Sequence, residues 1–463
     1  MKTATIIAIL IVYMLGMLYI GWRGSKHAEN FTDFLTAGKA GKLHLIVGSY
    51  LGGHLGTGIV VGGAAYGVTH GIGGAWYGLG AAGSFLLFGL FVSRWAYRNN
   101  YLTIPAYLRD RYPATGQIMT VVWALLGSAV AVTTLTSQII AGRALFQYLG
   151  IDPLVGTIIS VLVICVYCSA AGMFGVIATD FIQSTIIFIG LIVALFCCFG
   201  GGGLDMVTST LDASHFDWVP FDTPTLLLMV GPTAIYGLTQ GASMQLTASS
   251  DSEKTAFRGA ILGALGVAIV TFMPVFLGMY GAAAYPDVPA NSIIFTVILE
   301  KLPTLVAGLM LAAIVAAVMS TCDTTIMTII TSLVYDTYGN VLAPVMGHKT
   351  KQENLRKASV VMSFVLMAIA TVLAFISNDI ISVLSSGYTI FVAGGMIPFI
   401  AGRLWKGTTS YGALASMIVG SIFAWLNLMG IIHFPTSLFC LIPAAITVVV
   451  VSLFTKEKTP SVE

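Results

Sequence analysis

Two adjacent hydroxyl side chains stand in the middle of a long apolar stretch near residue 320. The stretch from Ala316 to Thr325 reads AAVMSTCDTT, and Ser320 and Thr321 follow Ala317 at helical spacing. Sodium is a hard cation that prefers oxygen ligands, as calcium and magnesium do. The two hydroxyls, the carbonyl of Ala317 and the carbonyls of a broken helix opposite would supply about five oxygens. The pattern predicts a small-cation site, although serine and threonine in helices also bond to their own backbone.

Two carboxylates lie inside apolar stretches. Asp323 follows the hydroxyl pair, and Asp180 lies about five residues into another apolar stretch. A charged group inside a membrane helix is costly, so it is a functional-site hypothesis by default. Asp180 is shallow enough that its side chain could instead reach the membrane interface. Both residues are candidates for binding an ion or a proton.

Two apolar stretches are interrupted by glycine, proline and polar residues. Residues 48–58 read GSYLGGHLGTG and residues 231–241 read GPTAIYGLTQG. Secondary transporters place their sites where such interrupted helices expose backbone carbonyls near the bilayer midplane. Close helix packing through small residues at i and i+4, such as Gly52 and Gly56, is the alternative interpretation. The matched pair favours two broken helices that face the hydroxyl-bearing stretch.

The elements that position these groups are transmembrane helices. Of the 463 residues, 57% are hydrophobic and 9% are charged, whereas soluble domains carry about a quarter charged residues. A bilayer core needs about 20 apolar residues per helix. With this window we predict a single integral membrane domain, residues 1–463, with about thirteen spans: 4–22, 43–69, 72–97, 118–148, 152–171, 176–199, 225–248, 259–284, 303–335, 356–377, 380–402, 409–428 and 434–454.

The distribution of lysine and arginine predicts the orientation, because cytoplasmic loops collect these residues. Counted against alternate loops, only Lys2, Arg143 and Lys301 of the 21 fall on one side. All the others fall on the opposite side. We therefore expect a multi-pass protein of the cell membrane with its N-terminus outside and its C-terminus in the cytoplasm.

Several function classes are excluded by what the sequence lacks. No GxxxxGK[ST] phosphate loop occurs, and no cytoplasmic segment exceeds about 20 residues, too short for a nucleotide-binding domain. No basic tract interleaved with aromatics indicates a nucleic-acid partner. The chain also lacks a nucleophile elbow and a metal-binding histidine pair, so we do not expect an enzyme. The expected partners are the lipid bilayer and a small-molecule solute, and transport would use an ion gradient or be passive.

The chain resembles the solute:sodium symporter family, whose members transport sugars, proline, pantothenate, sialic acid, iodide and carboxylates. The resemblance covers nearly the whole chain. It is carried by an alanine-rich helix that ends in an acidic-aromatic pair, by a glycine-start segment with Thr-Asp and Gln, by a Gln-Ala-Asp-Lys-Arg loop, and by a segment that begins PFIAGR. These are residues 316–338, 172–183, 245–259 and 398–412.

The resemblance implies an all-α, inverted five-plus-five (LeuT-like) fold. The first repeat would comprise residues 43–199 and the second residues 225–402. One extra helix, 4–22, would precede them, and two C-terminal helices, 409–454, would follow. It leaves the oligomeric state open, with a monomer sufficient for function.

The resemblance also implies the site residues. One sodium ion would bind the carbonyls of Tyr50, Gly53 and Ala317 and the hydroxyls of Ser320 and Thr321. A second sodium would lie near Asp180, Ser320, Asp323 and Thr324, although Asp323 stands where such a site uses a hydroxyl. The solute would contact residues between the broken helices, with the candidates His54, Thr57, Trp76, Gln138, Tyr236 and Gln240. His54, Trp76 and Tyr236 could equally be packing residues.

We therefore predict a sodium-coupled symporter that imports a small polar organic solute, a sugar, amino acid or monocarboxylate, by alternating access. Sodium would be co-transported, and its binding would favour the state that binds the solute. A proton-coupled symporter using Asp180 or Asp323 and a passive facilitator of the same fold are the alternatives. No lysine or arginine lies deep in a predicted helix, so no counter-ion for a multiply charged anion is evident.

Overall fold

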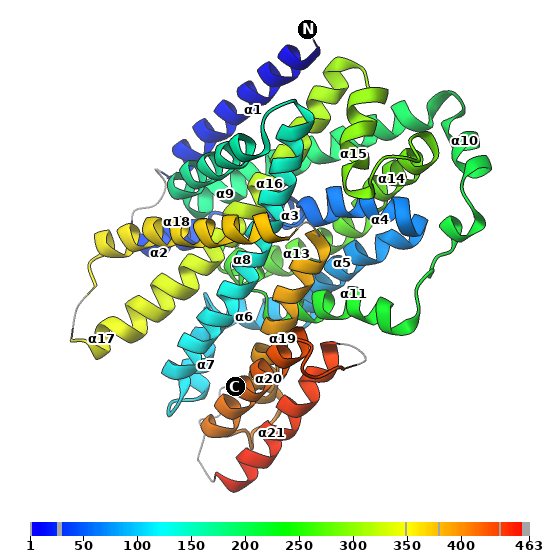
Figure 1. Ribbon diagram of the computed structural model, residues 1–463. Coiled ribbons are helices and arrows are strands. Elements are labelled where there is room, and N and C mark those ends of the chain that lie inside the picture. The colour runs from blue at the N-terminus through cyan, green and yellow to red at the C-terminus, as the bar shows by residue number, and fades with distance from the viewer. Residues whose placement is uncertain (1, 26–29, 348–349, 378–379, 435–436, 456–463) are drawn as a thin grey trace.

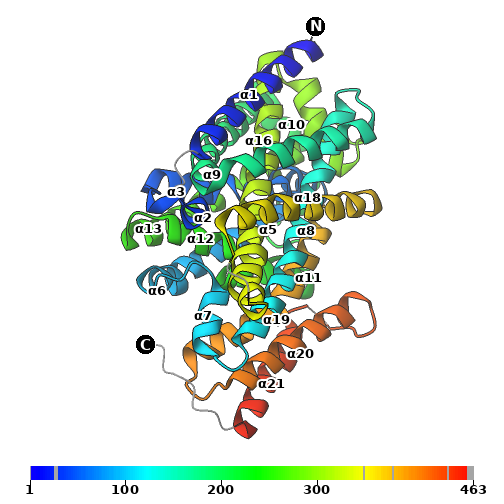
Figure 2. The ribbon, with the colours of Figure 1, turned by 90° about the vertical axis from the view of Figure 1, so that its left-hand side faces the viewer.

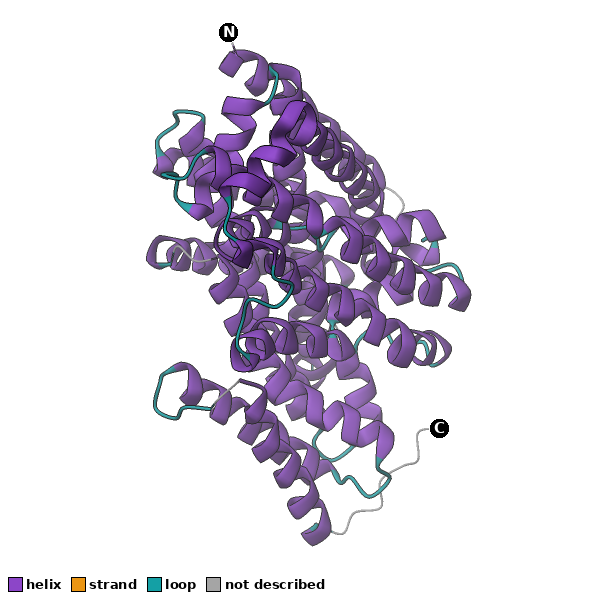
Figure 3. Ribbon diagram, turned by 90° about the vertical axis from the view of Figure 1, so that its right-hand side faces the viewer, coloured by secondary structure: helices purple, strands orange, loops and turns teal. Residues whose placement is uncertain are grey.

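The protein is an all-helical membrane protein. The computed structural model describes residues 2–25, 30–347, 350–377, 380–434 and 437–455. Within those ranges Figure 3 shows helices joined by loops and turns. Nine of the described helices are long and apolar enough to cross a membrane. Large apolar side chains on their outer faces are exposed, as a surface that faces lipid requires, for example Leu15, Phe196, Ile269 and Val361.

Helix occupies each of the ranges expected from hydropathy. The first part of the chain forms α1 (Lys2–Ser25), α2 (Phe31–Thr36), α3 (Leu43–Gly52), α4 (Gly63–His70), α5 (Trp76–Phe88), α6 (Arg94–Arg98), α7 (Ile104–Arg111), α8 (Gly116–Tyr148), α9 (Pro153–Phe199) and α10 (Gly203–Thr210). The second part forms α11 (Thr223–Tyr236), α12 (Gly241–Ser249), α13 (Glu253–Val270), α14 (Phe272–Ala284), α15 (Ile293–Thr296), α16 (Thr304–Ile330), α17 (Ala343–Val345), α18 (Gln352–Ile376), α19 (Ile380–Leu404), α20 (Ser410–Leu428) and α21 (Leu441–Phe454). The count of thirteen crossings stays a prediction.

One helix range, α9, covers two of the expected spans. Gly172 divides it, with φ 62° and ψ 169°, a backbone conformation that glycine adopts without a steric penalty. Asp152 begins the first part, because its side chain accepts hydrogen bonds from the backbone N–H groups of Leu154 and Val155. The residues after Gly172 carry Asp180 toward the interior, where its side chain is fully buried.

The centre of the molecule is α16, which packs along α9, α8 and α1. The helix α3 packs against α9 and α13, so it lies beside the same central group. Figures 1 and 2 show α1 at one end of the bundle and the paired helices α20 and α21 at the other. Ser320, Thr321 and Asp323 on α16 are consequently shielded by neighbouring helices rather than exposed to lipid.

Candidate ion and solute sites

The first interrupted helix breaks between α3 and α4. After Gly52 the helix is interrupted over residues 53–56, and the backbone N–H of Thr57 donates to the side-chain oxygen of Gln138 at 3.3 Å instead of to a carbonyl of its own helix. The chain resumes in a wide helical turn over residues 58–62 and continues into α4. The break leaves the carbonyl of Gly52 available to a side chain from another helix.

The second interrupted helix breaks between α11 and α12. Pro232 lies inside α11, a short tight turn covers Gly237–Thr239, and Gln240 is extended, with φ −68° and ψ 116°. Proline removes a backbone donor and disturbs the preceding turn of a helix. Both segments predicted to be interrupted are therefore interrupted in the structure.

Ser320 of α16 reaches the first break. Its hydroxyl oxygen lies 2.7 Å from the carbonyl oxygen of Gly52, 2.8 Å from that of Ala316 and 3.3 Å from that of Ala317. A hydroxyl has one proton to donate and two lone pairs that accept. Three carbonyls and a hydroxyl thus gather at one buried point, which is an oxygen environment of the kind that hard cations prefer.

Thr321 faces the same break from the next position. Its hydroxyl is buried and has no hydrogen-bond partner in the described part of the chain. A Cβ atom on Gly56 would lie 2.4 Å from this oxygen, so only glycine allows this approach. A buried hydroxyl without a partner is uncommon, and a bound cation would satisfy it.

The two α3 residues predicted as carbonyl ligands differ in their surroundings. The ring of Tyr50 packs edge-on against Phe85, so the residue can offer only its backbone to an ion at Ser320. A Cβ atom on Gly53 would lie 2.8 Å from the hydroxyl oxygen of Thr324. Gly52, which the sequence analysis named only as a packing residue and not as a ligand, makes the closest observed backbone contact with Ser320.

A second polar cluster lies beside the first and is built around Asp180. One carboxylate oxygen of Asp180 accepts a hydrogen bond from the Ser49 hydroxyl and lies 3.5 Å from the Thr324 hydroxyl. The other oxygen, Oδ1, is buried without a partner among the residues described. Asp323 accepts from the backbone N–H of Thr324 at 2.6 Å. Three of the four residues predicted for a second ion thus meet here, with Ser49 as an additional member, whereas the hydroxyl of Ser320 bonds to carbonyls of the first cluster.

Two adjacent cavities lie between the interrupted helices. The inner chamber has Tyr77, Ser84, Gln138 and Leu384 in its wall and encloses about 490 Å³, its opening included. The vestibule has Thr103, Pro105, Thr328 and Ser332 in its wall and encloses about 830 Å³, its opening included. Both cavities share one set of lining residues: Gly53, His54, Thr134, Tyr236, Gln240, Thr321 and Tyr388.

A short hydrogen-bonded chain crosses between the two breaks. The Gln240 side-chain nitrogen lies 2.5 Å from Nε2 of His54, and the Gln240 oxygen accepts from the Ser243 hydroxyl at 2.7 Å. With the amide as donor, His54 accepts at Nε2 and carries its proton at Nδ1. This chain joins residues of α12 to the break after α3 at the edge of both cavities.

Aromatic rings form one wall of the cavities. Tyr236 stacks on Tyr388 with 4.8 Å between ring centroids and meets Phe391 edge-on. Opposite lies Gln138, whose side-chain oxygen accepts from the backbone N–H of Thr57 at 3.3 Å. Stacked rings beside amide groups provide both an apolar face and hydrogen-bonding partners for a small molecule.

Trp76 lies apart from the other predicted solute residues. Its indole N–H donates to the carbonyl of Trp218 at 2.8 Å, and the two indole rings pack edge to face. Trp76 does not line either cavity. Tyr388 and Thr134 do line both, and their sequence surroundings give no signal that would have marked them.

An ion pair lies near the far end of the vestibule. Arg109 of α7 and Asp336, which follows α16, are 2.9 Å apart, and the Asp336 side chain is fully buried. Thr103, Thr331 and Ser332 around this pair belong to the vestibule wall. The pair therefore ties α7 to the end of the central helix beside the cavity.

Comparison with known proteins settles the family. A model of the sodium:solute symporter family matches residues 34–420. The chain belongs to the sodium:solute symporter family. The sodium/pantothenate symporter of Escherichia coli (strain K12) is 28% identical over 71% of this chain and 69% of its own length. The high-affinity proline transporter of Bacillus subtilis (strain 168) is 25% identical over 89% of this chain and 90% of its own.

A solved structure shows the same fold. A Na⁺-coupled sialic acid symporter, in a substrate-bound outward-open state, superposes with a TM-score of 0.84 at 19% identity and covers 99% of each chain. The chain described here is therefore a multi-pass transporter of the cell membrane rather than an enzyme. Sodium is its co-transported ion. The comparisons support sodium-coupled solute symport without determining the solute class.

Proposed function

We propose that the protein imports a small polar organic solute, a sugar, an amino acid or a monocarboxylate, together with sodium by alternating access. The observation that carries this proposal is the contact of the first interrupted helix with Ser320 and Thr321, beside a cavity that the second interrupted helix also lines. Thr321 belongs to the cavity wall and also faces the break at Gly56, where a Cβ atom would lie 2.4 Å from its oxygen. An ion at this position would link the geometry of the break to the shape of the solute cavity.

The proposed sodium site uses the hydroxyls of Ser320 and Thr321 and the carbonyl of Ala317. Carbonyls from the break, predicted as those of Tyr50 and Gly53, would complete it. Sodium would replace the hydrogen bond between Ser320 and Gly52, since the cation and the Ser320 hydroxyl proton compete for the same carbonyl oxygen. Binding would hold α3 and α16 in one relative position, which stabilises the conformation that binds the solute.

A second sodium position is proposed at Asp180, Ser320, Asp323 and Thr324. Two buried carboxylates in one cluster are unfavourable without a compensating cation or proton. Asp180 makes no ion pair within the described ranges, and one of its oxygens has no partner there. A cation between Asp180 and Thr324 would satisfy that oxygen.

The proposed solute position is the inner chamber. His54, Gln138 and Gln240 supply hydrogen-bonding groups, and Tyr236 supplies an aromatic face. Thr57 would act through its backbone contact with Gln138, and Trp76 would act from the side opposite the vestibule. Among the residues that the structure describes, the chamber wall holds no lysine or arginine, which favours a neutral, zwitterionic or singly charged solute.

The proposed orientation has the N-terminus outside and the vestibule open toward the cytoplasm. The vestibule reaches Thr103 and Pro105, next to the basic segment that contains Arg109 and Arg111. Trp218 stacks on Phe272 and meets Trp76 edge to face, and we assign these rings to the closed outer side of the protein. We assign thirteen crossings with an inverted five-plus-five repeat, and rocking of one bundle against the other would exchange the open and closed ends.

Uptake in proteoliposomes tests this proposal. Purified protein would be assayed with labelled candidates from the three solute classes under an inward sodium gradient, an equal potassium gradient or a proton gradient. We expect accumulation above equilibrium only with sodium. Equal uptake with potassium would instead indicate a passive facilitator, and proton-driven uptake without sodium would contradict sodium coupling.

A further inference from the structure

A groove on the lipid-facing side of α3 belongs to neither the ion clusters nor the solute cavities. It runs between α3, the second part of α9, and α13, and encloses about 1010 Å³, its open side included. Its wall includes His44, Val47, Leu51, Phe181, Phe188 and Leu262. The floor is closed by a tight contact, because a Cβ atom on Gly48 would lie 2.6 Å from the Cα atom of Phe181.

The groove offers an almost entirely apolar surface. Ser184 and Thr185 are its hydroxyl-bearing residues, and both donate to the carbonyl of Phe181, at 3.0 and 2.8 Å. Hydroxyls that bond back to their own helix leave little polarity for a ligand. A polar solute would gain no hydrogen bonds here, whereas a hydrocarbon chain would fit the surface.

The length of the groove matches one leaflet of a membrane. It extends along α3 from Leu43 to Leu51, and at 1.5 Å per residue this is about 12 Å. Half of a typical hydrocarbon core is about 15 Å. An acyl chain lying along α3 would therefore run from the membrane interface at His44 toward the bilayer midplane at Leu51.

Basic side chains lie at the interface end of the groove. Lys42 precedes α3 and is exposed, and His44 lies in the groove wall with its ring against Phe181. Arg258 lies one helical turn before Leu262 on α13 and is also exposed. Neither Lys42 nor Arg258 forms an ion pair with any residue that the structure describes.

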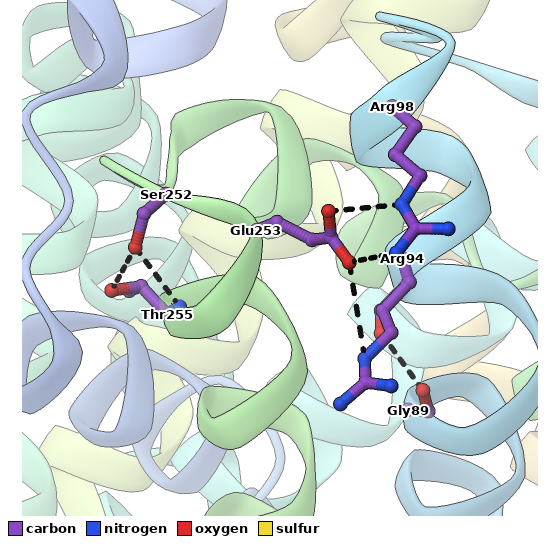
Figure 4. A network of polar contacts seen from close by, with 7 residues as sticks. Gly89, Arg94, Arg98, Ser252, Glu253 and Thr255 are labelled. Carbon is purple, nitrogen blue, oxygen red and sulfur yellow. Dashed lines mark hydrogen bonds and ion pairs between the residues drawn. The ribbon is translucent and has the colours of Figure 1, made fainter.

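Two neighbouring arginines, Arg94 and Arg98, differ from Lys42 and Arg258 because they have an acidic partner. Arg98 makes two hydrogen bonds with Glu253, at 2.9 and 2.8 Å, and Arg94 lies 4.0 Å from the same carboxylate (Figure 4). These two arginines already have an acidic partner at the start of α13. Lys42 and Arg258 have no such acidic partner within the described ranges, so their charges remain available to an anion.

We propose that this groove binds a phospholipid with an anionic headgroup, with one acyl chain along α3 and the phosphate between Lys42 and Arg258. Basic residues at the edge of a groove between membrane helices attract anionic lipid headgroups. The chain in the groove covers the apolar face that α3 turns away from the ion clusters. The bound lipid would thus support the helix whose other face carries Ser49 and Gly52.

Native mass spectrometry tests this assignment. The purified protein would be incubated with equal amounts of phosphatidylglycerol and phosphatidylcholine of the same chain length. We expect retention of phosphatidylglycerol in preference to phosphatidylcholine. The double variant Lys42→Gln/Arg258→Gln should weaken phosphatidylglycerol binding about 25-fold, from about fivefold per basic side chain.

The matched control is Arg94→Gln/Arg98→Gln, which removes the same charge near the same end of α13 but leaves Lys42 and Arg258 intact. It should keep phosphatidylglycerol binding within about threefold of the unmodified protein, since each arginine adds little beyond its pair with Glu253. A further variant, Leu262→Trp, fills the groove and should lower retention of both lipids while the gel-filtration profile and helical circular dichroism stay unchanged. Equal binding by both double variants, equal retention of the two lipids, or a groove occupied by a second copy of the chain in cross-linking would overturn the proposal.

Discussion

The ion clusters and the inner chamber share the break after α3, yet different kinds of chemical group line them. The ion clusters consist of backbone carbonyls, small hydroxyls and one short carboxylate contact, held together by glycines that allow helices to approach. The chamber consists of large rings and amide side chains around open space. A cation needs oxygens at fixed positions, whereas a solute needs volume with a few oriented polar groups.

The largest effect is expected when the hydroxyls of both Ser320 and Thr321 are removed from the ion cluster. Ser320→Ala/Thr321→Ala should weaken sodium activation of uptake about 100-fold or more, because a bond to a charged group contributes about 1.5–3 kcal/mol and two ligands are lost. The sodium concentration for half-maximal uptake measures the effect. Thr371→Ala, which removes a hydroxyl of α18 that donates to the carbonyl of Met367 and lines neither cavity nor the groove, is the control. Unchanged sodium dependence in the double variant would remove the ion-site assignment.

A smaller effect is expected from closing the approach between α16 and the break. In Gly56→Ala the added Cβ atom would lie 2.4 Å from the Thr321 hydroxyl, so the helices must shift. Overpacking costs about 1–3 kcal/mol, and we expect sodium affinity to fall about tenfold. Sodium binding to purified protein by calorimetry would measure the change. Gly16→Ala on α1, where the new atom would meet nothing within 4 Å, should behave like the unmodified protein.

Removing an amide side chain from the chamber should weaken solute binding and leave sodium binding nearly unchanged. Gln240→Ala leaves Nε2 of His54 without its partner and removes a proposed solute contact, so the solute KM should rise about tenfold. Sodium binding measured without solute should stay within about twofold, because the side chain of Gln240 bonds to His54 and Ser243 and not to Ser320 or Thr321. Gln183→Ala, a buried glutamine outside both cavities, is the control for the solute KM. A large loss of sodium binding in Gln240→Ala would mean that the two regions are not separable.

The smallest effect is expected at Trp76. Trp76→Phe loses the hydrogen bond to Trp218 but keeps an aromatic ring, and one such bond contributes about 0.5–1.5 kcal/mol. We expect uptake to change by about threefold or less if Trp76 only closes the outer end. A tenfold rise in the solute KM without a change in maximal uptake would instead make Trp76 a direct solute contact.

The sequence predicted the polar side chains of the ion clusters better than it predicted the backbone ligands or the chamber wall. Ser320, Thr321, Asp180 and Asp323 were recognisable because hydroxyls and carboxylates within apolar helices are conspicuous wherever they lie. Gly52 and Ser49 were not singled out as ligands, because their roles depend on which turn of α3 meets α16 and α9. Tyr388 and Thr134 line the chamber without any local signal, since an aromatic ring in a membrane helix commonly faces lipid or the helix interior.

The sequence alone determined the helical membrane class, the two interruptions and the helix boundary at Gly172. These features follow from local physics: the length of apolar stretches, the missing donor of proline and the backbone freedom of glycine. Only the tertiary structure decided that Ser320 meets the carbonyl of Gly52, that Gln240 meets His54, and that Trp76 turns to Trp218 instead of the chamber. Each of these contacts joins residues more than 100 positions apart, and packing of whole helices selects such pairs.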